Sequence, residues 1–377
     1  MKSKLLTSYF VCFVLLLSLF ISGCDSDSST KSNENQELIN KLKAVTDSLI
    51  ENTDLPGIVA LVVDKTKGID WVYEVGYSDL EQKLPMNKDY TFRIGSNTKT
   101  MTITVLFQLI KEGKLSLEDT LSKFFPTFKE ADKITITMLC NMSSGYFNYS
   151  EDTEYFGKTL EENPTKVWTP KELVDVSFLH DLYFEPGQDI HYSNTNTIIL
   201  GMLIEKLTGN SLETEIQNRI ITPLGLQKTK FLTSGLEFPG PHGKGYYTDN
   251  EKINTEVTNR YDVSWGWAAG SAYSTPRELQ KYVEKLVAGG LLTDSLQNIR
   301  LTKHFIPDDG KNAYGLGIVH RGSFFGHNGG MPGFTSSMYH SNSKNCSIII
   351  YFNCQKTGLI PDDLFLRYVD ILYGNNY

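Results

Sequence analysis

The sequence lacks the features that mark several large classes of protein. Its 377 residues carry a formal net charge of −8 and contain no run of basic residues, so we do not expect a nucleic acid as partner. Neither an H-E-x-x-H zinc motif nor a G-x-S-x-G nucleophile turn occurs, which disfavours two common plans of hydrolase. No internal repeat is present either, and the composition is that of an ordinary globular protein.

Cysteine is scarce, with five residues in the chain. Cys12 and Cys24 belong to the N-terminal segment, which leaves Cys140, Cys346 and Cys354 for the folded part. These three have no metal-ligand spacing. Cys346 and Cys354 bracket an expected strand, whose length holds them beyond disulfide reach. We therefore expect three buried thiols.

The N-terminal segment has no apolar run long enough to span a membrane. Lys2 and Lys4 precede an apolar run from Tyr9 to Ile21, which is shorter than the roughly 20 residues of a spanning helix and has the layout of an export signal. Its end, ISGC, resembles the lipobox of bacterial lipoproteins. The resemblance implies a signal peptide over 1–23, a lipid on Cys24, and an exported protein that is anchored to a membrane of the cell envelope. Residues 24–36, almost entirely polar, predict a flexible tether.

The rest of the chain, 37–377, predicts one sheet built from both ends of the chain with a helical insertion between them. A helix is expected over 37–51, followed by an antiparallel strand pair at 57–64 and 70–77. Helices dominate the middle, with start signals at Thr169-Pro170 and Thr275-Pro276 and apolar periodicity over 195–208 and 211–220. An antiparallel meander then uses the segments 313–320, 324–330, 334–340 and 346–353, and a helix over 361–373 closes the chain.

Ser96 and Lys99 stand at the start of an expected helix. The stretch FRIGSNTKTMTITVLFQLI reads as a strand that feeds a helix through Gly95-Ser96. Ser96 has the position of a helix N-cap, where the favoured residue three positions later is Glu or Gln. Lys99 has the wrong charge for that position, since a cation there faces the positive end of the helix dipole. A local rule broken without visible compensation indicates a functional residue.

S-x-x-K by itself is weak evidence, and context selects one pair. The spacing occurs at Ser28–Lys31, Ser96–Lys99 and Ser341–Lys344. The first pair lies in the polar tether and the last in a hairpin turn, whereas Ser96 and Lys99 are neighbours across one helical turn. Burial and the helix N-terminus both lower the pKa of a lysine, so Lys99 could take the proton of Ser96. The Ser96 N–H would face a developing oxyanion.

A second group must relay the proton to the leaving group, and Tyr192 is the preferred candidate. Tyr192-Ser193-Asn194 directly precedes a helix and follows a Pro-Gly turn. The same Y-x-N pattern occurs at Tyr146–Asn148 and Tyr351–Asn353; the first is a real rival, and the second lies within a strand. For any one of the 20 tyrosines the ordinary role is core packing.

The third candidate segment is FFGHNGGMPGF. It places His327 on a strand, and Gly329, Gly330 and Gly333 follow. Glycine in a strand permits the close approach of another backbone or of a ligand, although in an isolated case a barrel corner or bulge is the commoner reason. A phosphate loop is excluded because no Gly-Lys-Ser/Thr follows.

Taken together, Ser96-Asn97-Thr98-Lys99, Tyr192-Ser193-Asn194 and His327-Asn328-Gly329 resemble the three motifs of the serine penicillin-binding protein and β-lactamase superfamily. The likeness covers residues 40–353 and is strongest to class C β-lactamases, D-alanyl-D-alanine carboxypeptidases and related esterases. It implies an α+β fold, with an antiparallel sheet of five or more strands flanked by helices and a helical subdomain. In this chain the sheet subdomain would cover 37–95 and 260–377, and the helical subdomain 96–259.

The resemblance also implies roles for single residues. Ser96 would be the acylated nucleophile and Tyr192 the proton shuttle, while Lys99 would be either the base or the cation that keeps Tyr192 ionised. Asn194 would bind the substrate amide, and His327 would line the opposite wall with Gly329 and Gly330. The N–H groups of Ser96 and Gly330 would form the oxyanion hole, and no metal or organic cofactor is implied.

Two departures from the family pattern bear on function. His327 replaces the lysine of class C β-lactamases, so a group that ordinarily titrates near pH 6.5 replaces a fixed cation. Met142 stands where many relatives have histidine, which puts the hydrogen bonds of that loop in doubt. We therefore expect a serine hydrolase of a D-alanyl peptide or a related small amide or ester. The alternatives are a β-lactamase or broad esterase, and a non-catalytic penicillin-binding or sensor lipoprotein.

Overall fold

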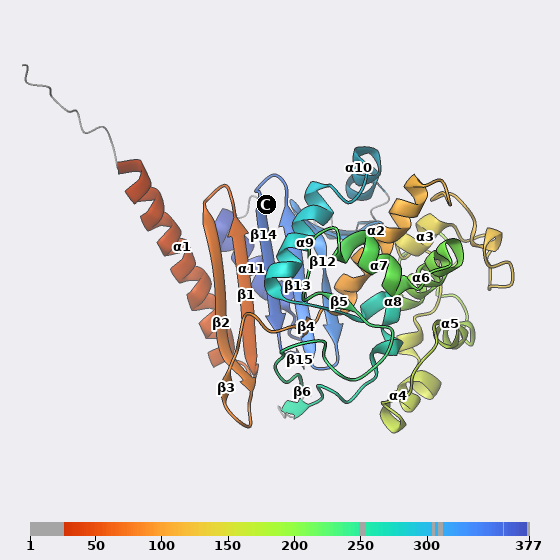
Figure 1. Cartoon of the computed structure of the whole chain (residues 1–377), viewed down its shortest axis with the longest axis horizontal. Coiled ribbons are helices and arrows are strands. Elements are labelled where there is room, and N and C mark those ends of the chain that lie inside the picture. Colours follow the sequence, from red (N-terminus) through yellow and green to blue (C-terminus); the bar gives the residue numbers. More distant parts are fainter. Residues whose placement is uncertain (1–25, 249–253, 304–305, 308–311, 357, 375–377) are drawn as a thin grey trace, which may run out of the picture.

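The computed structural model describes residues 26–248, 254–303, 306–307, 312–356 and 358–374. Within these ranges the main sheet has nine strands, in the order β3-β2-β1-β14-β13-β12-β11-β10-β9 (Figure 1). The strands are β1 Gly57–Asp64, β2 Ile69–Asp79, β3 Leu84–Pro85, β9 Ile306–Pro307, β10 Asn312–Tyr314, β11 Val319–Arg321, β12 Phe324–Met331, β13 Phe334–Ser341 and β14 Cys346–Phe352.

The two ends of the chain meet in the middle of this sheet, as the sequence predicts. β1 pairs antiparallel with β14, with Ala60 opposite Ile350. All eight residues of β1 are buried, because this strand is covered on both faces. The α+β fold with an antiparallel sheet of more than five strands is therefore confirmed.

Helices cover both faces of the sheet. On one face, Leu42 of α1 (Ser26–Glu51) and Phe365 of α11 (Pro361–Tyr373) share a core with Ile58 and Ile348. The neighbouring strand residues Val59 and Ile349 point to the opposite face, where a larger core includes residues of α2 (Thr98–Lys111) and α9 (Pro276–Ala288). This alternation follows the two-residue period of a strand.

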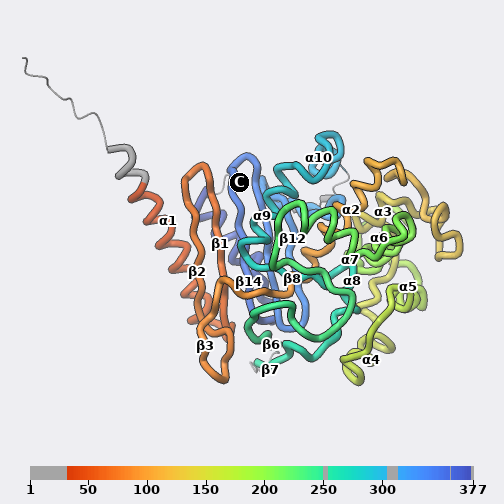
Figure 2. Tube along the Cα trace, viewed as in Figure 1, coloured from red at the N-terminus to blue at the C-terminus, as the bar shows by residue number. Residues whose placement is uncertain are grey.

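The middle of the chain gathers beside β12, on the side of the molecule away from α1 (Figure 2). Its helices are α3 Ile136–Cys140, α4 Lys158–Glu162, α5 Pro170–Phe178, α6 Asn194–Thr208, α7 Leu212–Ile216 and α8 Trp267–Gly270, and α10 Asp294–Thr302 follows α9. Short helical turns are η1 Gly95–Asn97, η2 Leu121–Lys123, η3 Tyr149–Glu151, η4 Thr153–Gly157, η5 Gln217–Ile221 and η6 Val263–Trp265. Two three-stranded sheets join β4 (Phe92–Arg93), β8 (Ala272–Ser274) and β5 (Lys230–Phe231), and β15 (Cys354–Lys356), β6 (Tyr246–Thr248) and β7 (Asn254–Glu256).

Several local signals in the sequence are confirmed. Thr169 and Glu172 form a reciprocal capping box at the start of α5, with Pro170 at the first helical position. The Thr275 side chain accepts the Glu278 N–H at the start of α9. Cys140, Cys346 and Cys354 are free, buried thiols.

The strand predicted over 313–320 is wrong. The segment folds into a hairpin instead, in which Tyr314 of β10 lies opposite Val319 of β11. Gly317 adopts a positive φ of 66°, and the Gly315 N–H donates to the Ile318 carbonyl (2.9 Å). A tight turn therefore interrupts the apolar pattern, and glycine permits it.

The N-terminal segment differs in part from the prediction. The signal over 1–23 and Cys24 lie outside the described residues. Residues 26–36, predicted to be a flexible tether, are helical and form the first turns of α1. Extending an existing helix adds a hydrogen bond for each residue that is fixed, and the Asn35 side chain donates to the Lys67 carbonyl (2.8 Å). No helix among the described residues has the length and apolar character to cross a membrane.

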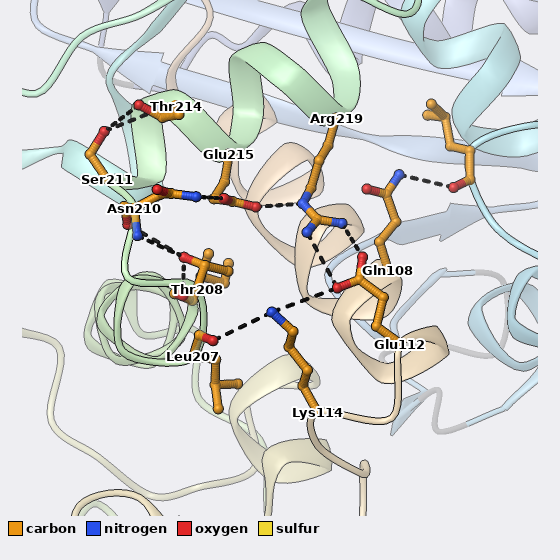
Figure 3. Close-up of polar contacts among 12 residues, drawn as sticks. Gln108, Glu112, Lys114, Leu207, Thr208, Asn210, Ser211, Thr214, Glu215 and Arg219 are labelled. Carbon is orange, nitrogen blue, oxygen red and sulfur yellow. Dashed lines mark hydrogen bonds and ion pairs between the residues drawn. The ribbon is translucent and has the colours of Figure 1, made fainter.

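The C-terminal end of α2 is held by an ion-pair cluster (Figure 3). Arg219 of η5 donates from Nε to Glu215 of α7 (2.5 Å) and from Nη1 to Glu112, the residue that follows α2 (2.5 Å). Asn210 donates to the other oxygen of Glu215 (2.7 Å). The guanidinium thus joins the end of α2 to the α7–η5 segment.

Candidate active site

Ser96 lies in the short turn η1, between β4 and α2. Asn97 fixes this turn by donating to the Ile94 carbonyl (2.9 Å) and to Ser336 Oγ on β13 (2.8 Å). The predicted role of Ser96 as an N-cap is wrong, because no side chain caps α2 and the residue before that helix is Asn97. The Ser96 hydroxyl is therefore not used to hold the helix.

Lys99 is the neighbour of that hydroxyl. Its side chain has no solvent exposure (0%), and Nζ lies 2.9 Å from Ser96 Oγ and 2.9 Å from the carbonyl oxygen of Ala269 in α8. Burial lowers the pKa of Lys99 well below its ordinary value, because the charged form loses its hydration. No carboxylate within the described ranges forms an ion pair with it, so the amine has the setting of a neutral base.

Tyr192 stands directly before Ser193, the N-cap of α6. Its ring centroid lies 4.9 Å from Lys99 Nζ. Burial raises the pKa of its phenol, although a hydrogen bond with Ser96 opposes the shift. Tyr192 therefore stays protonated near neutral pH. The phenol group itself is buried, although 36% of the surface of the whole residue is exposed. Ser96, Lys99 and Tyr192 form one cluster, as the sequence predicts.

The two rival tyrosines lie elsewhere. Tyr146 donates its hydroxyl to the Lys129 carbonyl (2.5 Å), and Tyr351 stacks on Phe92 with the ring centroids 4.6 Å apart. Both are core residues. Asn148 of the first rival motif nevertheless supports the site, because its Oδ1 accepts the backbone N–H of Asn194 (3.1 Å).

Asn194 lines the same small pocket as Ser96. Its side chain donates from Nδ2 to Ser150 Oγ (3.0 Å). With its backbone held by Asn148 and its amide by Ser150, the side chain has one defined orientation. Its Oδ1 is the atom left to accept from a substrate amide.

Gly329 and Gly330 bring β12 against the turn that carries Ser96. A Cβ on Gly329 would lie 2.8 Å from the Ser96 nitrogen and 2.0 Å from the Ile94 carbonyl oxygen, and one on Gly95 would lie 2.5 Å from the Gly330 nitrogen. The register between β12 and β13 is unbroken from Phe325 to Met331, so a bulge is not the reason for these glycines. They permit backbone contact, which brings the β12 backbone at Gly329 and Gly330 against that of Gly95 and Ser96.

His327 is on β12 but is not a group that titrates near pH 6.5. It is buried, and burial together with Lys99 lowers its pKa to about 3. Nδ1 lies 2.5 Å from the Asn328 carbonyl oxygen and Nε2 lies 3.2 Å from the Tyr314 hydroxyl. A carbonyl can only accept, so Nδ1 carries the proton and Nε2 accepts from Tyr314. The expected titration of His327 near neutral pH is therefore wrong.

The pocket also contains residues that sequence reasoning missed. Tyr149, Trp265, Ala269 and Met331 line it with Ser96 and Asn194, and its volume of about 20 Å³ has room for about one water molecule. Tyr149 donates to the Trp265 carbonyl (2.5 Å). Of these four residues, Met331 alone lies in a segment singled out from the sequence, FFGHNGGMPGF.

The loop of Met142 is held without a histidine. The Asn196 amide nitrogen lies 3.3 Å from the Met142 sulfur, and Asn196 Oδ1 accepts the hydroxyl of Ser144 (2.6 Å). The Met142 carbonyl accepts the His191 N–H (3.1 Å), next to Tyr192. Asn196 thus makes side-chain contacts that hold this loop in the absence of a histidine.

The described parts of the chain contain no cluster of three or more His, Cys, Asp or Glu residues that could hold a metal ion. The arrangement around Ser96 instead contains a hydroxyl nucleophile, a buried amine, a phenol donor and two N–H groups. These are the parts of an acyl-transfer site.

Comparisons with known proteins agree with this geometry. A family model described as Beta-lactamase matches residues 42–370. The Bacillus subtilis protein PbpX is 27% identical over 294 residues, which cover 77% of this chain and 70% of that protein. This chain spans 64% to 70% of the length of the first curated relatives.

Two solved structures are similar over most of the chain. A D-stereospecific amidohydrolase from Streptomyces sp. is 32% identical, with a TM-score of 0.75 and coverage of 83% of this chain and 93% of that one. A D-amino acid amidase from Ochrobactrum anthropi SV3 is 25% identical, with a TM-score of 0.78 and coverage of 89% and 99%.

Proposed function

The chain belongs to the beta-lactamase family, and on that premise we propose that it is a serine hydrolase that acts through an acyl-enzyme on amides or peptides of D-amino acids. The observation that carries the proposal is the contact between Ser96 Oγ and the buried Lys99 Nζ, at 2.9 Å. A serine becomes a nucleophile when a neighbouring base accepts its proton. Lys99 has the distance and the lowered pKa for that role.

Acylation begins when Ser96 Oγ attacks the substrate carbonyl carbon and its proton passes to the Lys99 amine. The opposite pKa shifts of the two candidate bases support this assignment, since burial favours neutral Lys99 and protonated Tyr192. The oxyanion lies between the N–H groups of Ser96 and Gly330. Each oxyanion donor contributes about 10²–10³-fold in comparable enzymes.

Collapse of the tetrahedral intermediate breaks the bond to the leaving group. Tyr192 donates its proton to the departing amine or alkoxide and regains one from the Lys99 ammonium. Water then attacks the acyl-enzyme, gives its proton to the same pair of groups, and releases the acid and Ser96. Asn194 holds the amide of the acyl part throughout.

An uncharged leaving group fits this site best. His327 is neutral above a pH of about 3, so the third motif supplies no cation for a carboxylate on the leaving side. D-alanyl-D-alanine peptides and β-lactams both carry such a carboxylate. The D-stereospecific amidohydrolase and the D-amino acid amidase among the similar structures support an amide substrate as well.

A substrate panel tests the proposal. Purified protein is assayed with D-phenylalanine amide, L-phenylalanine amide, a D-alanyl-D-alanine peptide, a cephalosporin and a short acyl ester. We expect steady turnover of the D-amide, and none with a Ser96→Ala variant. Full hydrolysis by Ser96→Ala would refute the site, and a preference for the peptide or the cephalosporin would replace the amidase by a carboxypeptidase or a β-lactamase.

A non-catalytic sensor is the alternative from another class. It would give one stoichiometric burst of product or of penicillin label, because it would acylate without turnover. The same assays with excess substrate distinguish the two, since an enzyme releases product many times per Ser96.

We also propose that the protein is exported and held on a membrane by a lipid on Cys24. The apolar run before ISGC supports this location. Metabolic labelling with an alkyne fatty acid in a bacterial host should tag the wild-type protein and not a Cys24→Ser variant. Equal labelling of both would refute the anchor.

A further inference from the structure

A larger pocket opens beside the catalytic one. Its volume is about 410 Å³, and its apolar walls come from Phe156, Leu160, Tyr247 and Tyr261. Phe156 and Leu160 belong to the η4–α4 segment, Tyr247 belongs to β6, and Tyr261 follows β7. A hollow of this size, walled by aromatic rings, suits a bulky organic group.

This pocket adjoins the catalytic one, because residues of the two walls contact each other. The Phe156 ring packs against Tyr149 (5.2 Å between centroids) and Trp265 (6.0 Å), which both line the catalytic pocket. Ser150, which fixes the Asn194 amide, lines the larger pocket. Pro332 lines it too, directly after Met331 of the catalytic pocket. The two pockets therefore lie next to each other, on either side of the contacts that Phe156 makes with Tyr149 and Trp265.

The direction of the substrate follows from the position of Tyr192. Its ring lies 6.1 Å from that of His327, so the leaving group departs towards the half of β12 that contains Phe324 and His327. Pro332 follows the opposite end of the same strand, and five residues of strand span about 16 Å. The larger pocket thus receives the acyl part of the substrate, beyond the amide that Asn194 holds.

The pocket wall carries one cation without a carboxylate partner. The Arg260 guanidinium lies over the Tyr261 ring, 5.2 Å from its centroid, and forms no ion pair with any residue in the described ranges. Glu256, close by in sequence, uses a carboxylate oxygen to accept the Thr258 N–H (2.7 Å). Among the described residues, Glu161 on α4 is the one carboxylate of the lining, and no ion pair joins it to Arg260.

The remaining polar groups of the lining include several that can donate a hydrogen bond. Tyr247, Thr255, Tyr261 and Gln355 each bring a hydroxyl or an amide N–H to the pocket. A guanidinium with several such donors is suited to a carboxylate, which only accepts hydrogen bonds.

From this arrangement we propose that the pocket is the acyl subsite and that Arg260 selects substrates whose acyl group is apolar in its body and ends in a carboxylate. The inference rests on the proposed hydrolysis of D-aminoacyl bonds and adds the chemical class of the acyl part. Glu161 opposes the same carboxylate, so the two residues tune the selectivity in opposite directions.

Two matched substrates test the subsite. They are the p-nitroanilides of N-glutaryl-D-phenylalanine and of its 4-carbamoylbutanoyl analogue, which have the same length and differ in one negative charge. We expect the wild-type protein to use the charged substrate with a kcat/KM roughly tenfold higher, the size of one charge-assisted hydrogen bond. Arg260→Gln should bring this ratio close to one.

Other variants give the inference its controls. Glu161→Gln should raise the ratio by about twofold to threefold, because a like charge is removed. Arg277→Gln removes another exposed arginine, one that pairs with Asp70 (2.7 Å) outside the pocket, and should leave the ratio unchanged. Tyr247→Ala, at a ring that is 43% exposed, should weaken both substrates equally.

The outcomes separate the subsite from the proposed function. If the uncharged anilide is hydrolysed and the wild-type ratio is near one, or if Arg260→Gln keeps the ratio, the subsite is refuted and the hydrolase stands. If neither anilide nor any amide of the panel is hydrolysed, the proposed function fails and the subsite fails with it.

Discussion

The basic side chains at the two ends of α2 lie in opposite electrostatic environments. At the N-terminal end, Lys99 is fully buried, and among the described residues no carboxylate pairs with it. Just beyond the C-terminal end, Arg219 contacts both Glu112 and Glu215 at 2.5 Å (Figure 3). Hydrogen bonds to Glu112 raise the pKa of Arg219, while burial lowers that of Lys99.

The difference indicates what each cation does. A cation between two carboxylates stays charged and joins structural elements, as Arg219 joins α2 to the α7–η5 segment. A buried lysine without an acid loses its proton instead, because an isolated charge is costly in a poorly solvated site. The Ala269 carbonyl and the Ser96 hydroxyl then hold the amine at the nucleophile. We expect changes at the first end to affect the reaction and changes at the second to affect stability.

The largest effect is expected from Lys99→Met. Loss of the base should slow acylation of Ser96 by at least about 10³-fold. The unfolding temperature should stay equal or rise, since a methionine does not bury an amine. Labelling rates with a fluorophosphonate and thermal unfolding check both parts. Lys111→Met, at an exposed residue of the same helix, is the control and should leave the labelling rate unchanged.

Tyr192→Phe should have the next largest effect. Removal of the proton donor should lower kcat by roughly 10²-fold with little change in KM, because the hydroxyl acts on the departing group. Tyr146→Phe is the matched control, since it loses only the hydrogen bond to the Lys129 carbonyl. Equal losses of kcat in the two variants would show that Tyr192 has no special role.

Breaking the ion-pair cluster at the C-terminal end of α2 should change the stability of the protein and not the rate of hydrolysis. Arg219→Met leaves two glutamates without their shared partner, and we expect a loss of up to about 1 kcal/mol in the free energy of unfolding, as for partly exposed pairs. Chemical denaturation measures the loss, and kcat/KM should stay within about twofold. A large loss of activity in a variant of normal stability would contradict the division between the two ends.

The sequence predicted the part of the site that depends on local spacing. Ser96 and Lys99 are one helical turn apart, so their contact follows from the helix that contains Lys99. The glycines after His327 predicted a close approach of some backbone or ligand, and the family resemblance placed Gly330 with Ser96. The bounds of β1 and α11, at Gly57–Asp64 and Pro361–Tyr373, followed from apolar period and proline position.

What the sequence missed depends on contacts between distant segments. The hairpin β10–β11 brings the Tyr314 hydroxyl to His327 (3.2 Å), and this burial removes the titration expected from the histidine. The sequence could not show that Ser96 is not an N-cap. The short turn η1 (Gly95–Asn97) contains Ser96, and α2 begins only at Thr98. Tyr149 and Trp265 belong to the short turns η3 and η6, whose positions no periodic pattern in the sequence indicates.

The smallest expected effect is the contribution of His327 to the pH dependence of stability. Its pKa is about 3 in the folded protein and about 6.5 when unfolded. Between these values the unfolded state binds more protons, so the contribution of His327 to stability is complete above pH 6.5 and is lost as the pH falls towards 3. A His327→Gln variant should therefore lose less stability than the wild type between pH 6.5 and 4. The activity of the wild type should show no inflection near pH 6.5 from this residue, and an inflection that disappears in His327→Gln would contradict the burial.

The most direct test of the account is the protonation state of Lys99 itself. NMR spectra of protein labelled with ¹³C and ¹⁵N at lysine, compared with those of Lys99→Met, identify the Lys99 side-chain signals. We predict chemical shifts of a neutral amine at pH 7 and titration well below the ordinary value of about 10.4. Signals of an ammonium group at pH 7 that titrate near or above that value would show that Lys99 is not the base.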